Sequence, residues 1–118
     1  MYDNNNPFAK ILRGELGCKK VWEDDKNLAF WSIEPKAPVH ILVIPKKNYV
    51  DFDDFSQNAS SDEISSTMQA ISKVAKIMNL EDGYRVVTNN GKNSGQSVFH
   101  LHFHILGKAV LSDDIKGL

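Results

Sequence analysis

The sequence predicts one α+β domain, residues 1–118, built from a five-stranded antiparallel sheet, one long helix and one short helix. Composition is the first observation, because 42% hydrophobic and 25% charged residues are typical of a globular chain. Continuity is the second, since no repeat, low-complexity tract or Pro/Gly/Ser-rich linker divides the chain. The third is the order helix, strands, helix, strands, which favours an antiparallel sheet with separate helices.

The short helix is expected to begin at Pro7. Asn6 can cap it, and proline suits the first helical position, where its missing N–H is not needed. The residues that follow at helical spacing give it one apolar face, formed by Phe8, Ile11 and Leu12. Glycine readily adopts the left-handed conformation that ends helices, so Gly14 or Gly17 is expected to mark the end.

Three strands are expected next. Residues 21–23 and 28–33 carry strand-forming side chains on either side of the polar turn 24–27, which predicts a hairpin. The run 40–44 is almost wholly apolar, which is typical of a strand buried in the middle of a sheet. Pro45 is expected to end this strand, because proline lacks the N–H that a sheet ladder uses.

The long helix is expected to begin after Ser60, because Ser60 and Glu63 have the spacing of a capping box. Its apolar stripe, which we interpret as core, consists of Ile64, Met68, Ile71, Val74, Ala75 and Met78. Residues 84–88 and 98–106 then predict the last two strands, and a polar loop at 89–97 connects them.

Charge and cysteine content limit the classes of partner. Lys and Arg number 14 and Asp and Glu number 15, so no basic surplus indicates a nucleic-acid or membrane partner. No apolar run approaches the ~18 residues needed to cross a bilayer. No signal peptide is visible and Cys18 is the only cysteine, which together predict a cytoplasmic protein without an intrachain disulfide.

Three of the four histidines stand at alternate positions, His100, His102 and His104. Alternate residues of a strand share a face, so the three imidazoles are expected on one side, each ~6.6 Å from the next. The apolar residues that flank them are expected to point into the core; these are Leu101, Phe103 and Ile105. The fourth histidine, His40, lies in the predicted central strand.

Three interpretations of this imidazole row are open. In the first, the row is a set of solvated or hydrogen-bonded histidines, although protonated neighbours repel one another. In the second it is a metal site, since two histidines at i and i+2 on a strand can chelate zinc and His40 can supply a further ligand. The third interpretation is acid–base or nucleophilic catalysis by imidazole.

The loop before the row favours catalysis on a phosphate ester. Asn89, Gly91, Gly95, Gln96 and Ser97 supply amide, hydroxyl and backbone N–H donors, which can surround an anion. Taken alone, the loop indicates only a hairpin connection. Beside three imidazoles it predicts a phosphate pocket in which one imidazole attacks phosphorus, a reaction that positioning and charge stabilisation support without a metal.

The run 100–106 matches the His-φ-His-φ-His-φ-φ signature, in which φ is apolar, of the histidine-triad (HIT) nucleotide hydrolases and transferases. The resemblance covers nearly the whole chain and is to the Hint branch, the adenosine phosphoramidases formerly called protein kinase C inhibitors. The further matching segments are Phe8–Ile11, Leu28–Phe30, Ala37–His40, Val43–Lys46 and Gly95–Val98. The resemblance implies a HIT-like fold.

This resemblance also implies a homodimer whose sheet continues across the interface, and cleavage of a purine nucleoside phosphoramidate at the α-phosphorus without a cofactor. His102 matches the nucleophile that forms a nucleotidyl-histidine intermediate. The carbonyl of His100 matches the group that fixes the His102 tautomer, and His104 and His40 match supporting histidines. The alternative is a nucleotide-binding or scaffolding protein with little catalysis.

The resemblance implies substrate-binding residues in the polar loop. Ser97 matches a residue near the phosphate and the leaving group, and Gln96 is its neighbour after Gly95. Asn89 matches a polar contact on the phosphate side. These residues are therefore expected to bind substrate.

Two segments depart from the Hint pattern. Hint-like sequences carry Asp-Ile-x-Pro, whose Asp holds the ribose hydroxyls, whereas here Ser32 takes the Asp position and is followed by Ile33. A serine hydroxyl donates and accepts a hydrogen bond but carries no charge; Glu34 is a candidate replacement. The tail 108–118 contains no aromatic residue, although the family's dimer partner often lends one to the leaving group. Ser32 and Ile33 are still expected to bind substrate.

Overall fold

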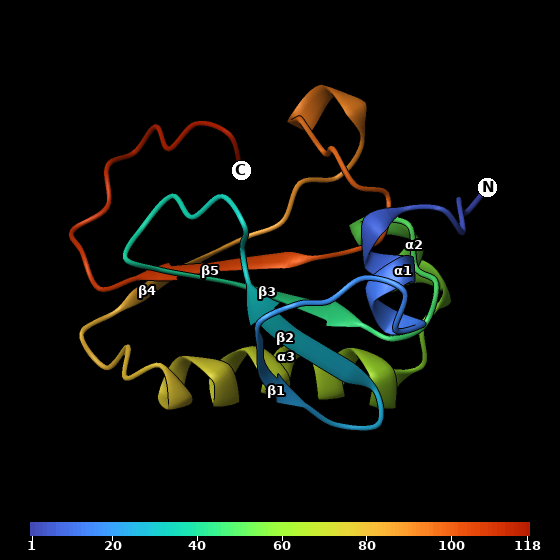
Figure 1. Cartoon of the computed structure of the whole chain (residues 1–118), viewed down its shortest axis with the longest axis horizontal. Coiled ribbons are helices and arrows are strands. Elements are labelled where there is room, and N and C mark those ends of the chain that lie inside the picture. The colour runs from blue at the N-terminus through green and yellow to red at the C-terminus, as the bar shows by residue number, and fades with distance from the viewer.

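Five antiparallel strands form one sheet, in the order β1-β2-β3-β5-β4 (Figure 1). The computed structural model describes residues 1–118. The strands are β1 (Lys20–Glu23), β2 (Asn27–Trp31), β3 (Val39–Pro45), β4 (Tyr84–Val87) and β5 (Phe103–Gly107). Every residue of β3 and β5 is buried, which is what their apolar sequences predict for the inner strands. The α+β class with a five-stranded antiparallel sheet is confirmed.

The register of β3 against β5 sorts their side chains onto two faces. Leu42 stands opposite His104, and Ile41 stands opposite Ile105. Opposed residues of neighbouring strands point to the same face of the sheet. The face that we call the histidine face therefore carries His40, Leu42, Ile44 and His104. The opposite face carries Ile41, Val43 and Ile105.

Helix α3 (Ser61–Ile77) covers the face opposite the histidines. The expected capping box starts it: the Ser60 hydroxyl accepts from the N–H of Glu63, and the Glu63 carboxylate accepts from the N–H of Ser60. Ile71, Val74 and Ala75 of the expected stripe lie in a core of 14 buried residues, and Ile64 and Met78 pack against it. Met68 is 42% exposed, so its expected place in the core is wrong. None of the helices has the length and apolar character needed to cross a bilayer.

Helix α1 (Pro7–Leu12) lies on the histidine face. The Asn6 side chain accepts from the N–H of Ala9 at 2.9 Å, which confirms the predicted cap. Gly14 follows the helix with φ of 80°, the left-handed conformation expected of a terminating glycine. Phe8 packs with the residues of a second, smaller core, Leu28, Phe30, Leu42 and Ile44. A six-residue helix covers only part of this face, and the histidines lie beside it.

Three features differ from the expected elements. The second strand, expected over 28–33, ends at Trp31, because residues 32–38 form the bend that leads into β3. A second short helix, α2 (Phe52–Asn58), was not predicted, because its acidic sequence buries only Phe55 and shows no apolar stripe. The last strand begins at Phe103 instead of residue 98, because residues 98–102 bend away from the sheet ladder. The alternation of side chains nevertheless continues through this bend: Leu101 lies in the α3-side core, while His102 contacts Phe8 of α1.

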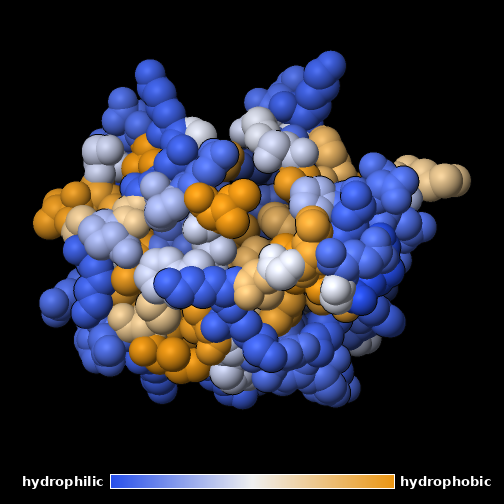
Figure 2. Space-filling model, viewed as in Figure 1, coloured by the Kyte–Doolittle hydropathy of each residue, from blue (hydrophilic) through white to orange (hydrophobic).

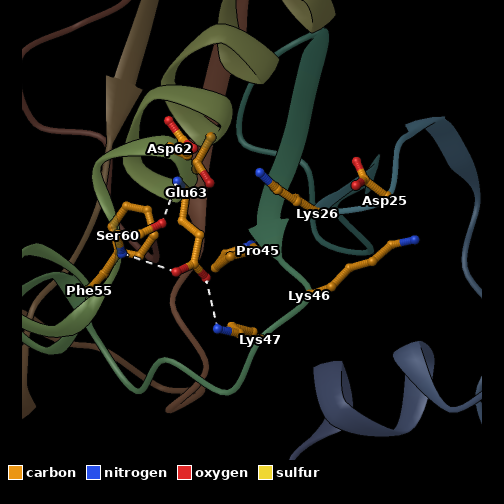
Figure 3. A pocket seen from close by; sticks show the side chains of 10 residues that line it. Asp25, Lys26, Pro45, Lys46, Lys47, Phe55, Ser60, Asp62 and Glu63 are labelled. Atoms are coloured by element: carbon orange, nitrogen blue, oxygen red, sulfur yellow. Dashed lines mark hydrogen bonds and ion pairs between the residues drawn. The ribbon is translucent and has the colours of Figure 1, made fainter.

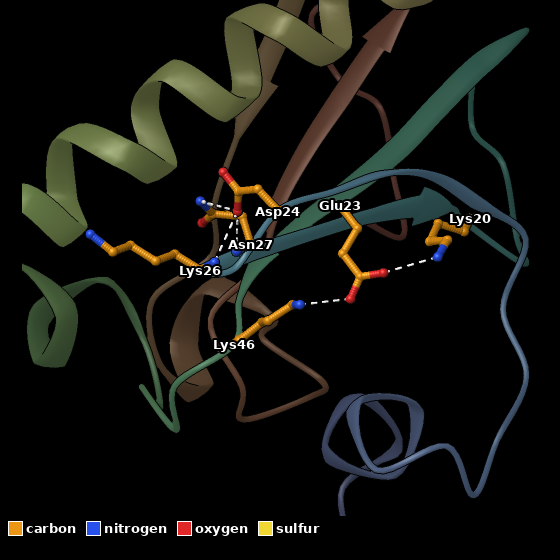
Figure 4. A network of polar contacts seen from close by, with 6 residues as sticks. All are labelled: Lys20, Glu23, Asp24, Lys26, Asn27 and Lys46. Atoms are coloured by element: carbon orange, nitrogen blue, oxygen red, sulfur yellow. Dashed lines mark hydrogen bonds and ion pairs between the residues drawn. The ribbon is translucent and has the colours of Figure 1, made fainter.

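A buried amide fastens the β1–β2 turn to α3. Asn27 is fully buried; its Nδ2 donates to the Ser66 hydroxyl at 3.0 Å, and its Oδ1 accepts from the Thr67 hydroxyl at 2.7 Å. The carboxylate of Asp24 accepts from the backbone N–H of Asn27 at 2.7 Å and from that of Lys26 at 3.0 Å (Figure 4). The turn and the helix therefore share one satisfied polar network.

Ion pairs at the surface lie next to this network. Glu23 accepts from Lys20 at 2.9 Å and from Lys46 at 2.6 Å, and its two carboxylate oxygens point in opposite directions toward the two lysines (Figure 4). Both lysines hold the pKa of Glu23 down to about 2. Exposed pairs of this kind contribute little to stability, because water screens them.

We expect Asn27→Ala to lower the free energy of unfolding by about 2 kcal/mol, because the buried Thr67 hydroxyl loses its acceptor and the turn loses its anchor. Urea unfolding followed by circular dichroism measures the change. Lys20→Ala is the matched control, and it should leave the unfolding midpoint almost unchanged. Equal effects of the two substitutions would contradict this assignment.

Candidate active site

A cleft of about 660 Å³ opens on the histidine face, a size suited to a small-molecule ligand. His40, His102 and His104 line one part of it. Apolar side chains line another part, among them Ile11, Leu16, Phe30, Ile33 and Leu42. Figure 2 shows apolar residues near the middle of this face and in further patches toward its left and lower-left edges, with polar residues between them. The cleft therefore combines imidazoles with an apolar wall.

His100 lies beneath the cleft and is fully buried. Its Nε2 lies 2.7 Å from the carbonyl oxygen of Pro45, at the end of β3. A carbonyl only accepts, so Nε2 carries the proton. Nδ1 of the neutral ring is then an acceptor, and the Tyr2 hydroxyl donates to it at 2.6 Å. Both nitrogens of His100 are occupied, so its side chain is held on two sides.

His102 has one bonded and one free nitrogen. Its Nδ1 lies 2.8 Å from the backbone carbonyl oxygen of His100, so Nδ1 donates and carries the proton. The Nε2 of the neutral ring consequently holds a lone pair. Phe8 packs edge-on against the ring, with centroids 4.9 Å apart, and limits its rotation. His102 thus offers a nucleophilic nitrogen in a fixed orientation.

A chain of hydrogen bonds sets the tautomer of His104. The backbone N–H of Lys36 donates to Nδ1 of His40 at 3.0 Å, so the proton of His40 is on Nε2. That Nε2 donates to Nδ1 of His104 at 2.9 Å. The proton of His104 is therefore on its own Nε2. This nitrogen is the one buried side-chain polar atom without a hydrogen-bond partner, and the residue is only 6% exposed. A buried donor left free at a cleft is suited to a ligand oxygen.

Burial keeps all four imidazoles neutral. Loss of hydration lowers the pKa of His40 and of His100 to about 4 and that of His104 to about 3. The pKa of His102 is also lowered by burial, although its hydrogen bond to the His100 carbonyl opposes the shift. Neutral rings are what the hydrogen-bond roles above require. At neutral pH the site therefore presents a lone pair on His102 and an N–H on His104.

These two nitrogens belong to neighbouring rings, whose centroids lie 5.1 Å apart. A lone pair attacks an electron-poor centre, and an adjacent N–H stabilises the negative oxygen bonded to that centre. A phosphate ester presents both atoms. The arrangement can therefore support nucleophilic attack on phosphorus.

Ser32, Ile33 and Ser97 line the same cleft as the imidazoles. The Ser32 hydroxyl accepts from the backbone N–H of Glu34 at 3.2 Å, which leaves its own proton free to donate. The Ile33 side chain is 96% exposed, so it is available to a ligand. The structure thus brings these three residues together with His40, His102 and His104.

Asn89 and Gly95 line an adjoining hollow of about 500 Å³ instead of the cleft. The Asn89 side chain donates to the carbonyl oxygen of Leu118 at 2.8 Å, and Leu118 lines both spaces. Gln96 is buried and points into its own loop. Its amide donates to the carbonyls of Val50 and Val98 and accepts from the N–H of Gly91. Gln96 therefore fixes the shape of the loop that carries Ser97.

Sequence reasoning missed two groups that hold the imidazoles. The backbone N–H of Lys36 sets the His40 tautomer, and a backbone group leaves no trace in residue types. The hydroxyl of Tyr2 meets His100 from 98 residues away along the chain, a pairing that no local pattern reveals. Phe8 was recognised as part of an apolar helix face, and the same signal accounts for its contact with His102.

A separate hollow of about 380 Å³ lies between the ends of β3 and α3 and carries charges of both signs. Figure 3 shows Lys46 directed away from Glu63, while the Glu63 carboxylate is bound to Ser60 and Lys47. Of the charged groups here, Glu63 serves the cap of α3. Nowhere in the structure do three or more His, Cys, Asp or Glu side chains form a group suited to a metal ion.

The fold and the imidazole row together define a class, and comparison with known proteins supports it. The family model described as HIT domain matches residues 13–110. The chain is 52% identical over 105 residues to a 13.2 kDa HIT-like protein of Azospirillum brasilense, a match that spans 88% of this chain and 86% of the other. It is 48% identical over 108 residues to a HIT-like protein of Rickettsia prowazekii, with 91% and 90% covered.

Solved structures agree. A histidine triad protein from Clostridium difficile superimposes with a TM-score of 0.86 at 41% identity, over 97% of this chain and 99% of that one. A HIT family hydrolase from Legionella pneumophila gives a TM-score of 0.86 at 37% identity, over 92% and 97%. A histidine triad nucleotide-binding protein from Candida albicans gives 0.77 at 29% identity, over 93% and 83%. The chain belongs to the HIT family, and the resemblance seen in the sequence is confirmed.

The buried histidines predict a loss of stability in mild acid. Between about pH 6.5, where an exposed histidine titrates, and the lowered pKa of each buried ring, the unfolded chain binds more protons than the folded one. Stability is complete above this window and falls as the pH falls through it. Within this window, each ring that stays neutral in the folded protein lowers the free energy of unfolding by up to about 1.4 kcal/mol for every unit by which the pH falls. Urea unfolding at about pH 7.5 and at about pH 5.5 measures the difference; equal values would contradict neutral burial.

Proposed function

We propose that the chain is a hydrolase of purine nucleoside phosphoramidates or related nucleoside monophosphate derivatives. One observation carries the proposal: the Nε2 lone pair of His102 lies beside the free Nε2–H of His104 at the cleft. The names of two relatives support it, since the Legionella protein is called a hydrolase and the Candida protein is called nucleotide-binding. No metal is needed for this chemistry.

In the first step Nε2 of His102 attacks the α-phosphorus, and a nitrogen–phosphorus bond forms as the bond to the leaving amine breaks. The amine departs with the electron pair of that bond and takes a proton from water. The substituted imidazole is then positively charged, and its Nδ1–H remains bonded to the His100 carbonyl, which stabilises the charge. The N–H of His104 donates to a phosphate oxygen throughout.

In the second step water attacks the same phosphorus. The bond to His102 breaks and its electron pair returns to Nε2, so the ring leaves the cycle as it entered. The phosphate product keeps the hydroxyl of the attacking water. The other proton of that water returns to the solvent and replaces the proton that the amine took from water in the first step. In sum one water cleaves one phosphorus–nitrogen bond.

The nucleoside fits the rest of the cleft. The apolar wall that includes Phe30 and Leu42 suits a purine ring, and Ser32 and Ile33 lie where a ribose can reach them. Ser97 supplies a hydroxyl for the phosphate side. Asn89 and Gly95 act from the adjoining hollow, and Gln96 acts by holding the loop.

A second candidate is a nucleotide-binding or scaffolding protein with little catalysis. The observation that favours it is Ser32, whose uncharged hydroxyl offers one free donor to two ribose hydroxyls. A loosely held ribose would place phosphorus less accurately, and turnover falls steeply with misplacement. Turnover assays separate the two candidates.

We infer further that residues 1–118 form one cytoplasmic domain that works as a homodimer. β4 is an edge strand, and its apolar residues Tyr84 and Val86, which stand on the α3 side of the sheet, are 41% and 44% exposed. An unpaired edge with exposed apolar side chains is suited to pairing with a second copy. The single thiol, Cys18, is compatible with a reducing compartment.

We expect His102→Ala to lower the release of AMP from adenosine 5′-phosphoramidate by at least about 10³-fold, because no other free lone pair faces the phosphorus. EDTA should not change the rate of the unmodified protein. Calorimetric titration with AMP should show that the variant still binds the product. Turnover retained in His102→Ala would overturn the mechanism; binding without turnover in the unmodified protein would favour the second candidate.

For the dimer, light scattering coupled to gel filtration should give twice the chain mass of 13.3 kDa. Val86→Glu places a charge on the β4 edge and should return the protein to the mass of one chain. Val110→Glu, in the exposed tail, is the matched control and should leave the dimer intact. A single-chain mass for the unmodified protein would contradict the proposed dimer.

A further inference from the structure

Tyr2 is the one residue of the N-terminal segment whose side chain reaches the imidazole row by a hydrogen bond. Its hydroxyl donates to Nδ1 of His100 at 2.6 Å, and its ring packs edge-on against the same imidazole, with centroids 5.6 Å apart. Tyr2 does not line the cleft. It also lies outside residues 13–110, so the family match assigns it no role.

The segment that carries Tyr2 is fastened in place. The backbone N–H and the side-chain amide of Asn6 both donate to the carbonyl of Asp3, at 3.1 and 2.8 Å. The guanidinium of Arg13 donates to the carbonyl of Asn4 at 2.7 Å. These bonds tie the segment to α1, so Tyr2 approaches His100 from a braced element.

His100 is held partly by its side chain. Residues 98–102 lie outside the sheet ladder, so the peptide that joins His100 to Leu101 is held by a single backbone bond, from the N–H of Leu101 to the carbonyl of Tyr49 at 2.8 Å. The imidazole instead spans two elements: Nε2–H bonds to Pro45 at the end of β3, and Nδ1 is bonded by Tyr2. Without the second bond, one side-chain bond and one backbone bond remain to hold His100. Its backbone then has more freedom to shift, and with it the carbonyl that holds Nδ1–H of His102.

We propose that Tyr2 is a positioning residue: through His100 it holds the carbonyl that keeps the His102 proton on Nδ1 and aims Nε2 into the cleft. For catalysis this inference rests on the proposed function, but the effect on the His102 proton does not. Tyr2 touches no reacting atom. It therefore influences kcat and leaves substrate binding nearly unchanged.

The test compares Tyr2→Phe with Tyr49→Phe. The first substitution keeps the ring contact with His100 and removes only the hydroxyl. The second removes a hydroxyl that donates to Glu63 at 2.9 Å and makes no hydrogen bond to an imidazole; it leaves the backbone bond from Leu101 to Tyr49 in place and serves as the matched control for lost stability. Two quantities are measured in each: the exchange rate of the His102 Nδ1 proton by nuclear magnetic resonance, and kcat and KM for adenosine 5′-phosphoramidate.

In Tyr2→Phe we expect proton exchange to rise about ten-fold and kcat to fall about ten-fold, the equivalent of about 1.4 kcal/mol, with KM within about two-fold. Tyr49→Phe should lower the unfolding midpoint and leave both quantities unchanged. Unchanged exchange and kcat in Tyr2→Phe would reduce Tyr2 to a structural role and overturn the inference. If the unmodified protein shows no turnover, the proposed function fails and the exchange rate alone decides the role of Tyr2.

Should Tyr2→Phe not fold, the unmodified protein supplies the answer. A hydroxyl proton donated to a buried nitrogen is protected from solvent, so the Tyr2 hydroxyl should give its own resonance with a nuclear Overhauser effect to the His100 ring. An unprotected hydroxyl would show that Tyr2 does not hold His100, and would overturn the inference.

Discussion

One hydrogen bond, from Nδ1 of His102 to the backbone carbonyl of His100, determines what the site can do. A neutral imidazole has one proton, so fixing it on Nδ1 leaves the lone pair on Nε2, toward the cleft. The N–H of Lys36 donates to Nδ1 of His40, and Nε2 of His40 donates to Nδ1 of His104. The proton of His104 therefore lies on its Nε2. Neighbouring rings of the same residue type thus present a lone pair and an N–H, and the difference comes from backbone groups, directly for His102 and through the His40 side chain for His104.

The unequal cover of the two sheet faces makes this possible. A 17-residue helix, α3, fills the face opposite the histidines, whereas the six-residue α1 covers only part of the histidine face. The uncovered part is the cleft, and the four imidazoles at or near it are each at most 7% exposed. Loss of hydration lowers their pKa values, so the rings stay neutral and do not repel one another. The consequence is lower stability in acid, because the four buried histidines take up protons when the protein unfolds there.

Much of this arrangement is visible in the sequence. The alternation of histidine and apolar residues at 100–106 predicts one imidazole face, and the alternation persists even where residues 98–102 leave the ladder. Strand limits were less predictable, because a bend depends on tertiary contacts such as the bond from Leu101 N–H to the Tyr49 carbonyl. Helix α2 has too few apolar residues to show a stripe. The inward turn of Gln96 and the bond from Tyr2 depend on partners far along the chain, which spacing cannot show.

The protonation of each ring nitrogen is the central claim, and long-range proton–nitrogen correlation spectra of the ¹⁵N-labelled protein at neutral pH measure it directly. We expect His102 with its proton on Nδ1 and His104 with its proton on Nε2, both rings neutral. Spectra showing a protonated Nε2 on His102, or a charged imidazolium at either position, would contradict the assignment of nucleophile and donor.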